Sequence, residues 1–163
     1  MILALDIATK VGFAVGTPGG VPLLGSFELQ GQDFSQQSAD LLIQIKAMIE
    51  QYHVNKIVFE APLMNPMRRG PKGKMIPASS KGKRKLIGLC AVIECVAGLY
   101  DLPVHEIHPK TIRAKFLGNG QLRSARAKEL AYDQCGRLGW DVELEDYDAS
   151  DAGVLWWCAS RVK

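Results

Sequence analysis

Residues 2–7 constrain the fold of this chain more than any other segment. Their sequence, ILALDI, is apolar at every position except Asp6, which is typical of a strand buried on both faces at the centre of a sheet. Two further strands are predicted at 11–15 and 21–29, separated by the turn signal TPGG at 17–20. We therefore expect an antiparallel meander whose first strand becomes the central strand of the sheet.

Helical and strand patterns alternate through the rest of the sequence. Apolar spacing predicts helices at 35–52, 86–100, 124–138 and 149–162, and strands at 56–60 and 103–107. The first of these helices has Ser35 as its predicted N-cap. Because a helix that joins two strands of one sheet makes a parallel crossover, we expect one α/β domain over 1–163. Its sheet should have five strands, antiparallel first and parallel later, with helices on both faces.

Length and composition fit an ordinary soluble domain. The 163 residues are 47% hydrophobic and 23% charged, close to typical globular usage. No apolar run approaches the ~20 residues of a membrane span, and no signal-type segment opens the chain, so we expect a cytoplasmic protein without a membrane partner. His108 is expected to cap the end of strand 103–107. Buried, reduced thiols rather than zinc ligands are expected at Cys90, Cys95, Cys135 and Cys158, which form no CxxC pair.

Positive charge is concentrated in one stretch. Residues 61–93 contain no Asp or Glu, whereas the rest of the chain is net acidic. The basic residues of this stretch are Arg68, Arg69, Lys72, Lys74, Lys81, Lys83, Arg84 and Lys85. Interspersed prolines and glycines predict a flexible loop over about 64–85. Such a loop favours a polyanionic partner, most simply nucleic acid, although a solvated face is the alternative.

Two carboxylates occupy positions that an apolar core does not favour. Asp6 interrupts the predicted central strand, and Glu60 ends the predicted strand 56–60. An unpaired buried carboxylate costs several kcal/mol, and no basic residue lies at a matching strand position. If the two strands are parallel neighbours, ~4.8 Å apart, both side chains can reach one divalent cation, and oxygen ligands suit Mg²⁺ or Mn²⁺. Solvation at the strand ends is the alternative.

A third acidic signal opens the last predicted helix. Asp148 and Asp151 are three residues apart, so both side chains share one helix face. Capping and the helix dipole explain acidic residues at such a position equally well. Taken with Asp6 and Glu60, however, the pair predicts a four-carboxylate cluster of the type that holds two metal ions for phosphodiester hydrolysis.

This ordered set of motifs resembles the RuvC-like Holliday junction resolvases of the ribonuclease H-like superfamily. Residues 2–15 resemble the first hairpin of that family, 57–60 its second acidic strand, and 148–152 its closing DxxDA motif. The stretch 104–138 is similar to the family as well. The short sequence segments at Cys135–Trp140 and around Trp156 resemble those of phage-type or prophage-type members. The basic loop after Glu60 departs from the family because it is longer and richer in proline.

The resemblance implies a crossover junction endodeoxyribonuclease that acts on branched DNA and leaves 5′-phosphate nicks. Two Mg²⁺ ions, or Mn²⁺ in their place, are implied to bind to Asp6, Glu60, Asp148 and Asp151. Lys128 is implied to stabilise charge on the phosphorane, with a solvated helix lysine as the alternative. Arg113 and Lys115 are implied to contact phosphates without reading sequence.

A four-way junction has two equivalent scissile strands, so we expect a C2 homodimer. Helix 86–100 is its expected interface, with Gly88 and Gly98 allowing close approach, although packing against the chain's own sheet also explains the apolar stripe. Three other functions stay open: a nuclease for flaps or RNA–DNA hybrids, a catalytically silent DNA-binding relative, and a sugar-kinase or actin-like ATPase. The ATPase class needs two such lobes, and these residues account for one.

Overall fold

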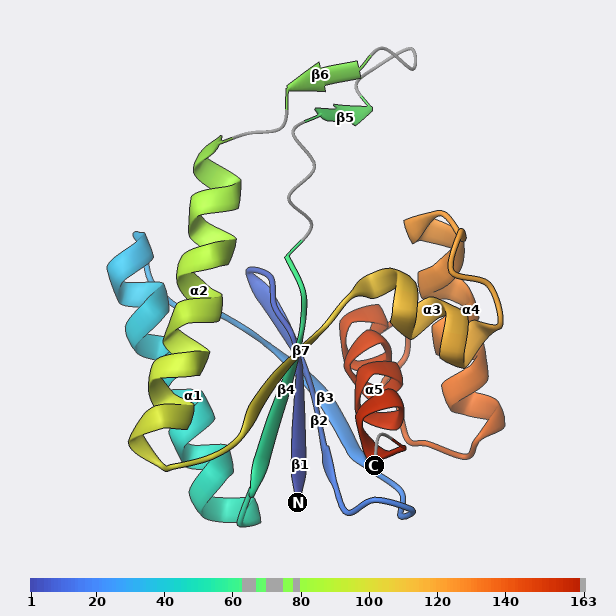
Figure 1. The fold of residues 1–163 in the computed structure, drawn as a ribbon, viewed down its shortest axis with the longest axis horizontal. Coiled ribbons are helices and arrows are strands. Elements are labelled where there is room, and N and C mark those ends of the chain that lie inside the picture. Colours follow the sequence, from blue (N-terminus) through green and yellow to red (C-terminus); the bar gives the residue numbers. More distant parts are fainter. Residues whose placement is uncertain (63–66, 70–74, 78–79, 162–163) are drawn as a thin grey trace.

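A five-stranded mixed sheet runs through the centre of the protein (Figure 1). The structure, a computed structural model, describes residues 1–62, 67–69, 75–77 and 80–161. In spatial order the strands of this sheet are β3 (Leu23–Glu28), β2 (Lys10–Gly16), β1 (Ile2–Asp6), β4 (Lys56–Glu60) and β7 (Val104–Ile107). The three strands of the N-terminal meander are antiparallel, whereas β1, β4 and β7 are parallel. The predicted mixed sheet is therefore confirmed.

Strand β1 is central because its side chains are apolar on both faces. Leu3 and Leu5 point into one core, and Ile2 and Ala4 point into the other, as the two-residue period of a strand requires. Leu3, Ala4 and Leu5 are fully buried. The alternation accounts for the continuous apolar sequence that precedes Asp6.

Helices cover both faces of the sheet, as predicted (Figure 1). One layer consists of α1 (Phe34–Tyr52) and α2 (Ser80–Leu99), which pack against each other and against the first core. The other layer consists of α3 (Pro109–Leu117), α4 (Ser124–Arg137) and α5 (Tyr147–Ser160). Helix α5 thus lies on the strands of the N-terminal meander.

Helix α5 lies deepest in its layer. It contacts β1, β2 and β3 on one side and α3 and α4 on the other, so most of its residues are buried and it has no polar face. Trp156 is buried on β2, and its indole Nε1 donates a hydrogen bond of 3.3 Å to the backbone oxygen of Gly16. This packing holds the acidic N-terminal turns of α5 at one edge of the sheet.

Two predicted caps are wrong. The N-cap of α1 is Asp33 and not Ser35, because the Asp33 side chain accepts a hydrogen bond of 2.9 Å from the backbone amide of Gln36. His108 does not cap the end of β7. Its Nδ1 accepts from the backbone amide of Lys110, at 3.1 Å, and so caps the start of α3, a helix that the sequence patterns did not predict.

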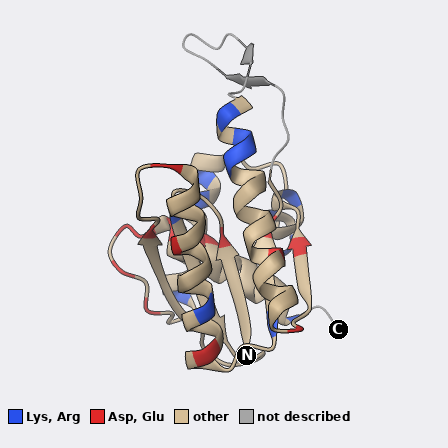
Figure 2. Cartoon of the chain, turned by 90° about the vertical axis from the view of Figure 1, so that its left-hand side faces the viewer, with Lys and Arg blue, Asp and Glu red and all other residues tan. Residues whose placement is uncertain are grey.

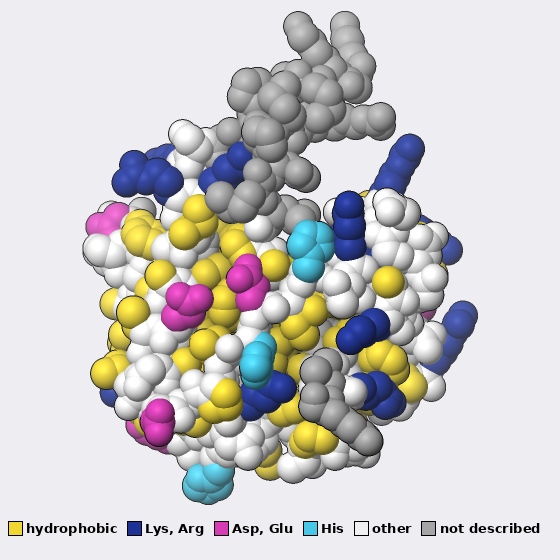
Figure 3. All heavy atoms as spheres, viewed as in Figure 1, with side chains coloured by type: hydrophobic (Ala, Val, Ile, Leu, Met, Phe, Trp, Pro, Cys, Tyr) yellow, Lys and Arg dark blue, Asp and Glu magenta, His cyan; other side chains and the backbone are white. Residues whose placement is uncertain are grey.

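The predicted flexible loop over about 64–85 is wrong at its C-terminal end. Helix α2 begins at Ser80, so its first turns carry Lys81, Lys83, Arg84 and Lys85. Figure 2 shows Lys and Arg in blue at this end of a helix, and Figure 3 shows dark blue side chains gathered at the upper left of the surface. The apolar period that predicts a helix begins only after these turns. Strands β5 (Met67–Arg69) and β6 (Met75–Pro77) pair antiparallel within the same stretch. Arg68 and Arg69 are in β5, and Lys72 and Lys74 lie outside the described residues.

The cysteine prediction holds at three positions of four. Cys90, Cys135 and Cys158 are buried and Cys95 is exposed, and all four are free thiols. Cys95 is wrongly predicted because it lies on the outer side of α2, away from the buried stripe of that helix. Within the described part of the chain, no helix combines the length and the apolar character needed to cross a membrane.

Candidate active site

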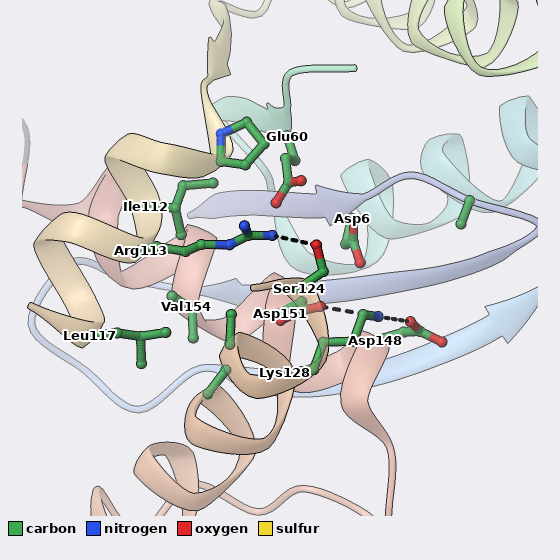
Figure 4. A pocket seen from close by; sticks show the side chains of 14 residues that line it. Asp6, Glu60, Ile112, Arg113, Leu117, Ser124, Lys128, Asp148, Asp151 and Val154 are labelled. Atoms are coloured by element: carbon green, nitrogen blue, oxygen red, sulfur yellow. Dashed lines mark hydrogen bonds and ion pairs between the residues drawn. The ribbon is translucent and has the colours of Figure 1, made fainter. Parts of the chain in front are cut away.

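Four carboxylates line one cavity of about 260 Å³ at the carboxyl edge of the parallel strands (Figure 4). Asp6 ends β1 and Glu60 ends β4. These strands are parallel neighbours, with Leu5 opposite Phe59, so the two acidic residues that follow come to the same edge. Asp148 and Asp151 reach the cavity from the first turns of α5. The structure thus brings together all four carboxylates that the sequence singled out.

The two strand carboxylates resist ionisation. Burial, followed by repulsion from Asp151 and Asp148, raises the pKa of Asp6 to about 7 despite the opposing effect of Lys128. Burial and repulsion from Asp6 and Asp151 raise the pKa of Glu60 to about 8. Neither carboxylate forms a salt bridge with any residue that the structure describes. A cation in the cavity would therefore offset both the cost of burying the two charged carboxylates and the repulsion between them and their acidic neighbours.

Lys128 of α4 faces the two carboxylates of α5 (Figure 4). Its Nζ donates a hydrogen bond of 2.8 Å to Asp148 Oδ1 and lies 3.1 Å from Asp151 Oδ2. Burial alone would lower the pKa of Lys128, but these two partners raise it overall. The lysine therefore carries its positive charge in the cavity, where the structure places it with its side chain 41% exposed.

The acidic pair on α5 is not needed to cap the helix. Asp146 is the N-cap, and its Oδ1 accepts a hydrogen bond of 3.3 Å from the backbone amide of Ala149. Asp148 and Asp151 can therefore face Lys128 and the cavity instead. Helix capping was the alternative explanation of Asp148 and Asp151 in the sequence, but the residue that caps α5 is Asp146.

Arg113 of α3 also lines the cavity, whereas Lys115 is not among the residues that line it. The guanidinium of Arg113 donates to the backbone oxygen of Leu122, at 3.1 Å, and to Oγ of Ser124, at 3.4 Å. These bonds fix Arg113 beside the start of α4, as Figure 4 shows. Of the two predicted phosphate contacts, the structure brings only Arg113 to the carboxylates.

Comparison with known proteins relates this arrangement to solved structures. No protein-family model and no curated protein sequence matches the chain. RuvC from T. thermophilus, solved in complex with a Holliday junction substrate, has a TM-score of 0.70 and 12% sequence identity, covering 94% of this chain and 88% of that chain. Another Thermus thermophilus RuvC structure has a TM-score of 0.64 and 12% identity, covering 94% and 89%. The chain has the RuvC fold.

A second resolvase structure shows the same likeness. The yeast mitochondrial Holliday junction resolvase Ydc2 has a TM-score of 0.56 and 19% identity, covering 98% of this chain and 79% of that chain. The predicted ribonuclease H-like architecture is thereby confirmed as that of RuvC. The phage-type or prophage-type assignment stays a prediction.

The donor set of this RuvC fold suits a hard divalent cation. Four carboxylates from three elements offer oxygen ligands of the type that Mg²⁺ and Mn²⁺ prefer. Among the described residues, however, no three His, Cys, Asp or Glu side chains stand as a ready-made metal site. The ammonium of Lys128 contacts both α5 carboxylates, where a cation would be attracted. The residues fit the group once Lys128 moves aside.

The basic start of α2 is tied to the loop that follows β1. Lys85 Nζ donates a hydrogen bond of 3.1 Å to Oγ1 of Thr9, three residues after Asp6. The N-terminal turns of α2, which carry the four basic residues described above, therefore lie at the carboxylate-bearing edge of the sheet. Of the predicted DNA-binding set, these four can be placed relative to the cavity, whereas the side chains of Arg68 and Arg69 lie outside the described residues.

Sequence reasoning missed three polar residues beside the cavity. Lys10 Nζ lies 3.0 Å from Asp146 Oδ1 and 3.9 Å from Asp148 Oδ2, and Ser26 Oγ lies 2.6 Å from Asp146 Oδ2. The position of Asp146 just before a helix was a signal for an N-cap. Lys10 and Ser26 carried no comparable signal, because their proximity to Asp146 depends on how α5 docks on the sheet.

Proposed function

We propose that this protein is a metal-dependent endodeoxyribonuclease that cleaves Holliday junctions or related branched DNA. The observation that carries the proposal is the convergence of Asp6, Glu60, Asp148 and Asp151 in one cavity of a RuvC fold, next to Lys128. The likeness to a RuvC solved with a Holliday junction substrate and to a yeast Holliday junction resolvase supports the same class of substrate here.

The four carboxylates are the proposed ligands of two Mg²⁺ ions, for which Mn²⁺ can substitute. When bound, the ions supply activation of the attacking water and neutralisation of charge at the leaving 3′ oxygen. The raised pKa values of Asp6 and Glu60 support this role, because both carboxylates lack a cationic partner at hydrogen-bond distance among the described residues. Cleavage in this manner leaves a 5′-phosphate at the nick.

Lys128 and Arg113 are the proposed cationic contacts of the scissile phosphate. Lys128 is already at the cavity wall and, once released from the α5 carboxylates, would present its ammonium to the negative charge that develops on the phosphoryl oxygens. Arg113 is held by Leu122 and Ser124, so it offers a fixed donor that orients the strand. Lys115, outside the cavity, is proposed to contact only the flanking phosphates.

The basic stretch is the proposed docking surface for the junction arms. It combines Lys81, Lys83, Arg84 and Lys85 on the first turns of α2 with Arg68 and Arg69 of β5, and with Lys72 and Lys74, which lie outside the described residues. The position of the α2 turns at the carboxylate edge of the sheet supports contact with the DNA strand that enters the cavity. Phosphate contacts of this type position DNA and do not read its sequence.

A homodimer would place two such cavities on the two equivalent strands of a junction. Most of the apolar stripe on α2 is buried within the chain, and Gly88 serves the contact with α1, because a Cβ there would overlap the ring of Phe34. The exposed large apolar side chains of these two helices are Phe34 and Ile43 of α1 and Ile87 and Leu99 of α2, and Leu99 is 74% exposed. We propose that this outer face of the α1–α2 layer is the dimer interface.

A cleavage assay tests the proposal directly. End-labelled four-way junction, flap, RNA–DNA hybrid and linear duplex are incubated with the protein in Mg²⁺, in Mn²⁺ and in EDTA. We expect metal-dependent nicks in the junction, with 5′-phosphate termini that a ligase reseals. Preferential cleavage of flaps or hybrids would assign the same chemistry to another substrate, and binding without cleavage in either metal would leave a DNA-binding protein.

A further inference from the structure

Three residues form a row across the sheet at the level of the acidic cavity. Asp6 of β1 lies opposite Gly12 of β2, and Gly12 lies opposite Ser26 of β3. Asp6 lines the cavity, whereas Ser26 is two strands away. The register of the meander therefore links the cavity to β3.

The first turn of α5 rests directly on this row. A Cβ at Gly12 would overlap the backbone oxygen of Asp148, so the absence of a side chain there lets α5 approach β2 closely. Such a contact limits how near the helix can come. A contact at one glycine sets the separation of α5 and β2 at that point, whereas the orientation of the first turn also depends on other contacts.

Asp146 supplies the directional bonds that the steric contact lacks. Its residue is only 6% exposed, and its carboxylate accepts from Ser26 Oγ at 2.6 Å, from Lys10 Nζ at 3.0 Å and from the backbone amide of Ala149 at 3.3 Å. These donors come from β3, β2 and α5, so three elements meet at one side chain.

Asp146 differs from the carboxylates that line the cavity. The Lys10 ammonium lies 3.0 Å from Oδ1 of Asp146, and Ser26 and Ala149 donate two further hydrogen bonds to the carboxylate. Its charge is therefore already satisfied by the protein. Asp146 does not line the cavity and has no need of an added cation.

We propose that Asp146 is a positioning residue, which holds the carboxylates of Asp148 and Asp151 at the cavity by tying the first turn of α5 to Lys10 and Ser26. The inference rests on the proposed nuclease function. Because both carboxylates are on the same rigid turns, a small rotation of α5 moves them together relative to Asp6. A displacement of ~1 Å in an active site can lower a rate by about 100-fold.

The test compares Asp146→Asn with the wild type. Asn keeps the shape and one acceptor oxygen for Ala149, but it loses the charge that pairs with Lys10. We expect kcat on a four-way junction to fall by about 10- to 100-fold with KM unchanged. We also expect Mg²⁺ to raise Tm less in this variant than in the wild type, a readout that does not require cleavage.

Two sets of variants separate positioning from simple stabilisation. Asp33→Asn is the matched control, because Asp33 caps α1 in the same way and accepts from Ser35, but lies in the other helical layer. It should change neither kcat nor the Mg²⁺-dependent rise in Tm, because Asn caps a helix about as well as Asp. Lys10→Arg keeps a cationic donor for Asp146, so it should retain most of the activity that Lys10→Met loses.

The outcomes distinguish this inference from the proposed function. If Asp146→Asn lowers Tm but keeps the wild-type kcat and the full Mg²⁺-dependent rise, Asp146 is only a cap and the inference is overturned. If the wild type gains stability from Mg²⁺ yet leaves junctions intact, the proposed function is overturned. In that case, a smaller Mg²⁺-dependent rise in Tm for Asp146→Asn than for Asp33→Asn would still support the positioning role of Asp146. Equal rises in the two variants would reject that role.

Discussion

The ammonium of Lys128 lies 2.8 Å from the carboxylate of Asp148, inside the cavity that is proposed to bind Mg²⁺. In this position the lysine offsets the repulsion between Asp148 and Asp151, to which it also binds. A divalent cation bound to the same carboxylate oxygens would displace it. We therefore propose that metal binding and the release of Lys128 are coupled, which would make the released ammonium available to the substrate.

The coupling predicts opposite effects of one substitution on two measurements. In Lys128→Met we expect a lower Tm in EDTA and a larger rise in Tm on adding Mg²⁺, because the metal no longer competes with an internal cation. We expect kcat to fall by about 100-fold or more, because a donor to the transition state is removed. Lys128→Arg, which keeps the charge, is the control. Unchanged cleavage by the Met variant would exclude Lys128 from the reaction.

Asp6→Asn should abolish cleavage while leaving the fold and junction binding intact. Asn has nearly the same shape as Asp, and it removes a buried charge that repels its neighbours, so the metal-free protein should be at least as stable as the wild type. Circular dichroism melts and gel-shift assays in EDTA measure fold and binding. Wild-type nicking by the purified variant would show that Asp6 is not a metal ligand.

Stability without metal should fall as pH rises from about 4 to 8. The folded-state pKa values of Asp6 and Glu60, about 7 and about 8, lie above the ordinary values of 3.8 and 4.5. Between those limits the native state binds more protons than the unfolded state, so deprotonation on raising the pH destabilises the fold. Below the ordinary values both states are protonated and this contribution is complete.

Mg²⁺ should reverse that trend, because metal ligands must be deprotonated. We expect the Mg²⁺-dependent rise in Tm, and the cleavage rate, to increase over the same pH interval. Melts in EDTA and in Mg²⁺ at pH 5, 6, 7 and 8 provide the measurement, with Asp6→Asn flattening both profiles. A metal-dependent rise that does not vary with pH would contradict the assignment of these two carboxylates.

Removing charge from the basic stretch should weaken binding more than chemistry. Alanine at Arg68, Arg69, Lys72 and Lys74 should reduce the slope of log K against log salt by up to about 0.9 for each phosphate that is no longer neutralised. Cleavage at saturating DNA should change less than affinity, because phosphate contacts of this type stabilise the bound substrate and the transition state alike. Lys46→Ala, on the exposed part of α1, is a single-charge control. Identical salt slopes for the quadruple variant and the wild type would reject phosphate contacts.

Charge on the outer face of α2 should disrupt the proposed dimer. Leu99→Asp places a carboxylate at a side chain that is exposed in the single chain, so it should leave the fold intact. In light scattering we expect a monomer, and on a junction we expect uncoordinated single nicks in place of paired ones. Gly136→Ala, at an open position on α4, is a surface control. A wild type that is monomeric with and without junction DNA would overturn the proposal.

The sheet was predictable because its signals are local. An apolar strand such as β1 is typical of the centre of a sheet, and the helices before β4 and β7 favour parallel strands, so Asp6 and Glu60 were expected at one edge if β1 and β4 were neighbours, as the structure shows. The tie between Lys10, Ser26 and Asp146 was not predictable, because it depends on strand register together with the docking of α5. Helix propensity and apolar spacing carry no information on strand register or on how α5 docks on the sheet.

Some helical segments were not predictable because they lack a local signal in the sequence. Helix α3 escaped prediction because it is short and buries only Pro109 and Ile112, too few positions to show a period. The first turns of α2 escaped because they are basic and contain Gly82, which is typical of a loop. Lys128 could be assigned only by resemblance, since its place in the cavity follows from the packing of α4 on α5.

The packing of α5 on β1 brings together proposed catalytic carboxylates that are encoded near opposite ends of the sequence. A ribosome that stalls before residue 147 has synthesised Asp6 and Glu60, but neither Asp148 nor Asp151. Such a nascent chain also lacks the helix that covers one face of the sheet, so it cannot complete its second core. Aborted translation products of this kind thus lack two of the four proposed metal ligands and part of the second core, and the proposed nuclease activity is confined to chains that have been synthesised through α5.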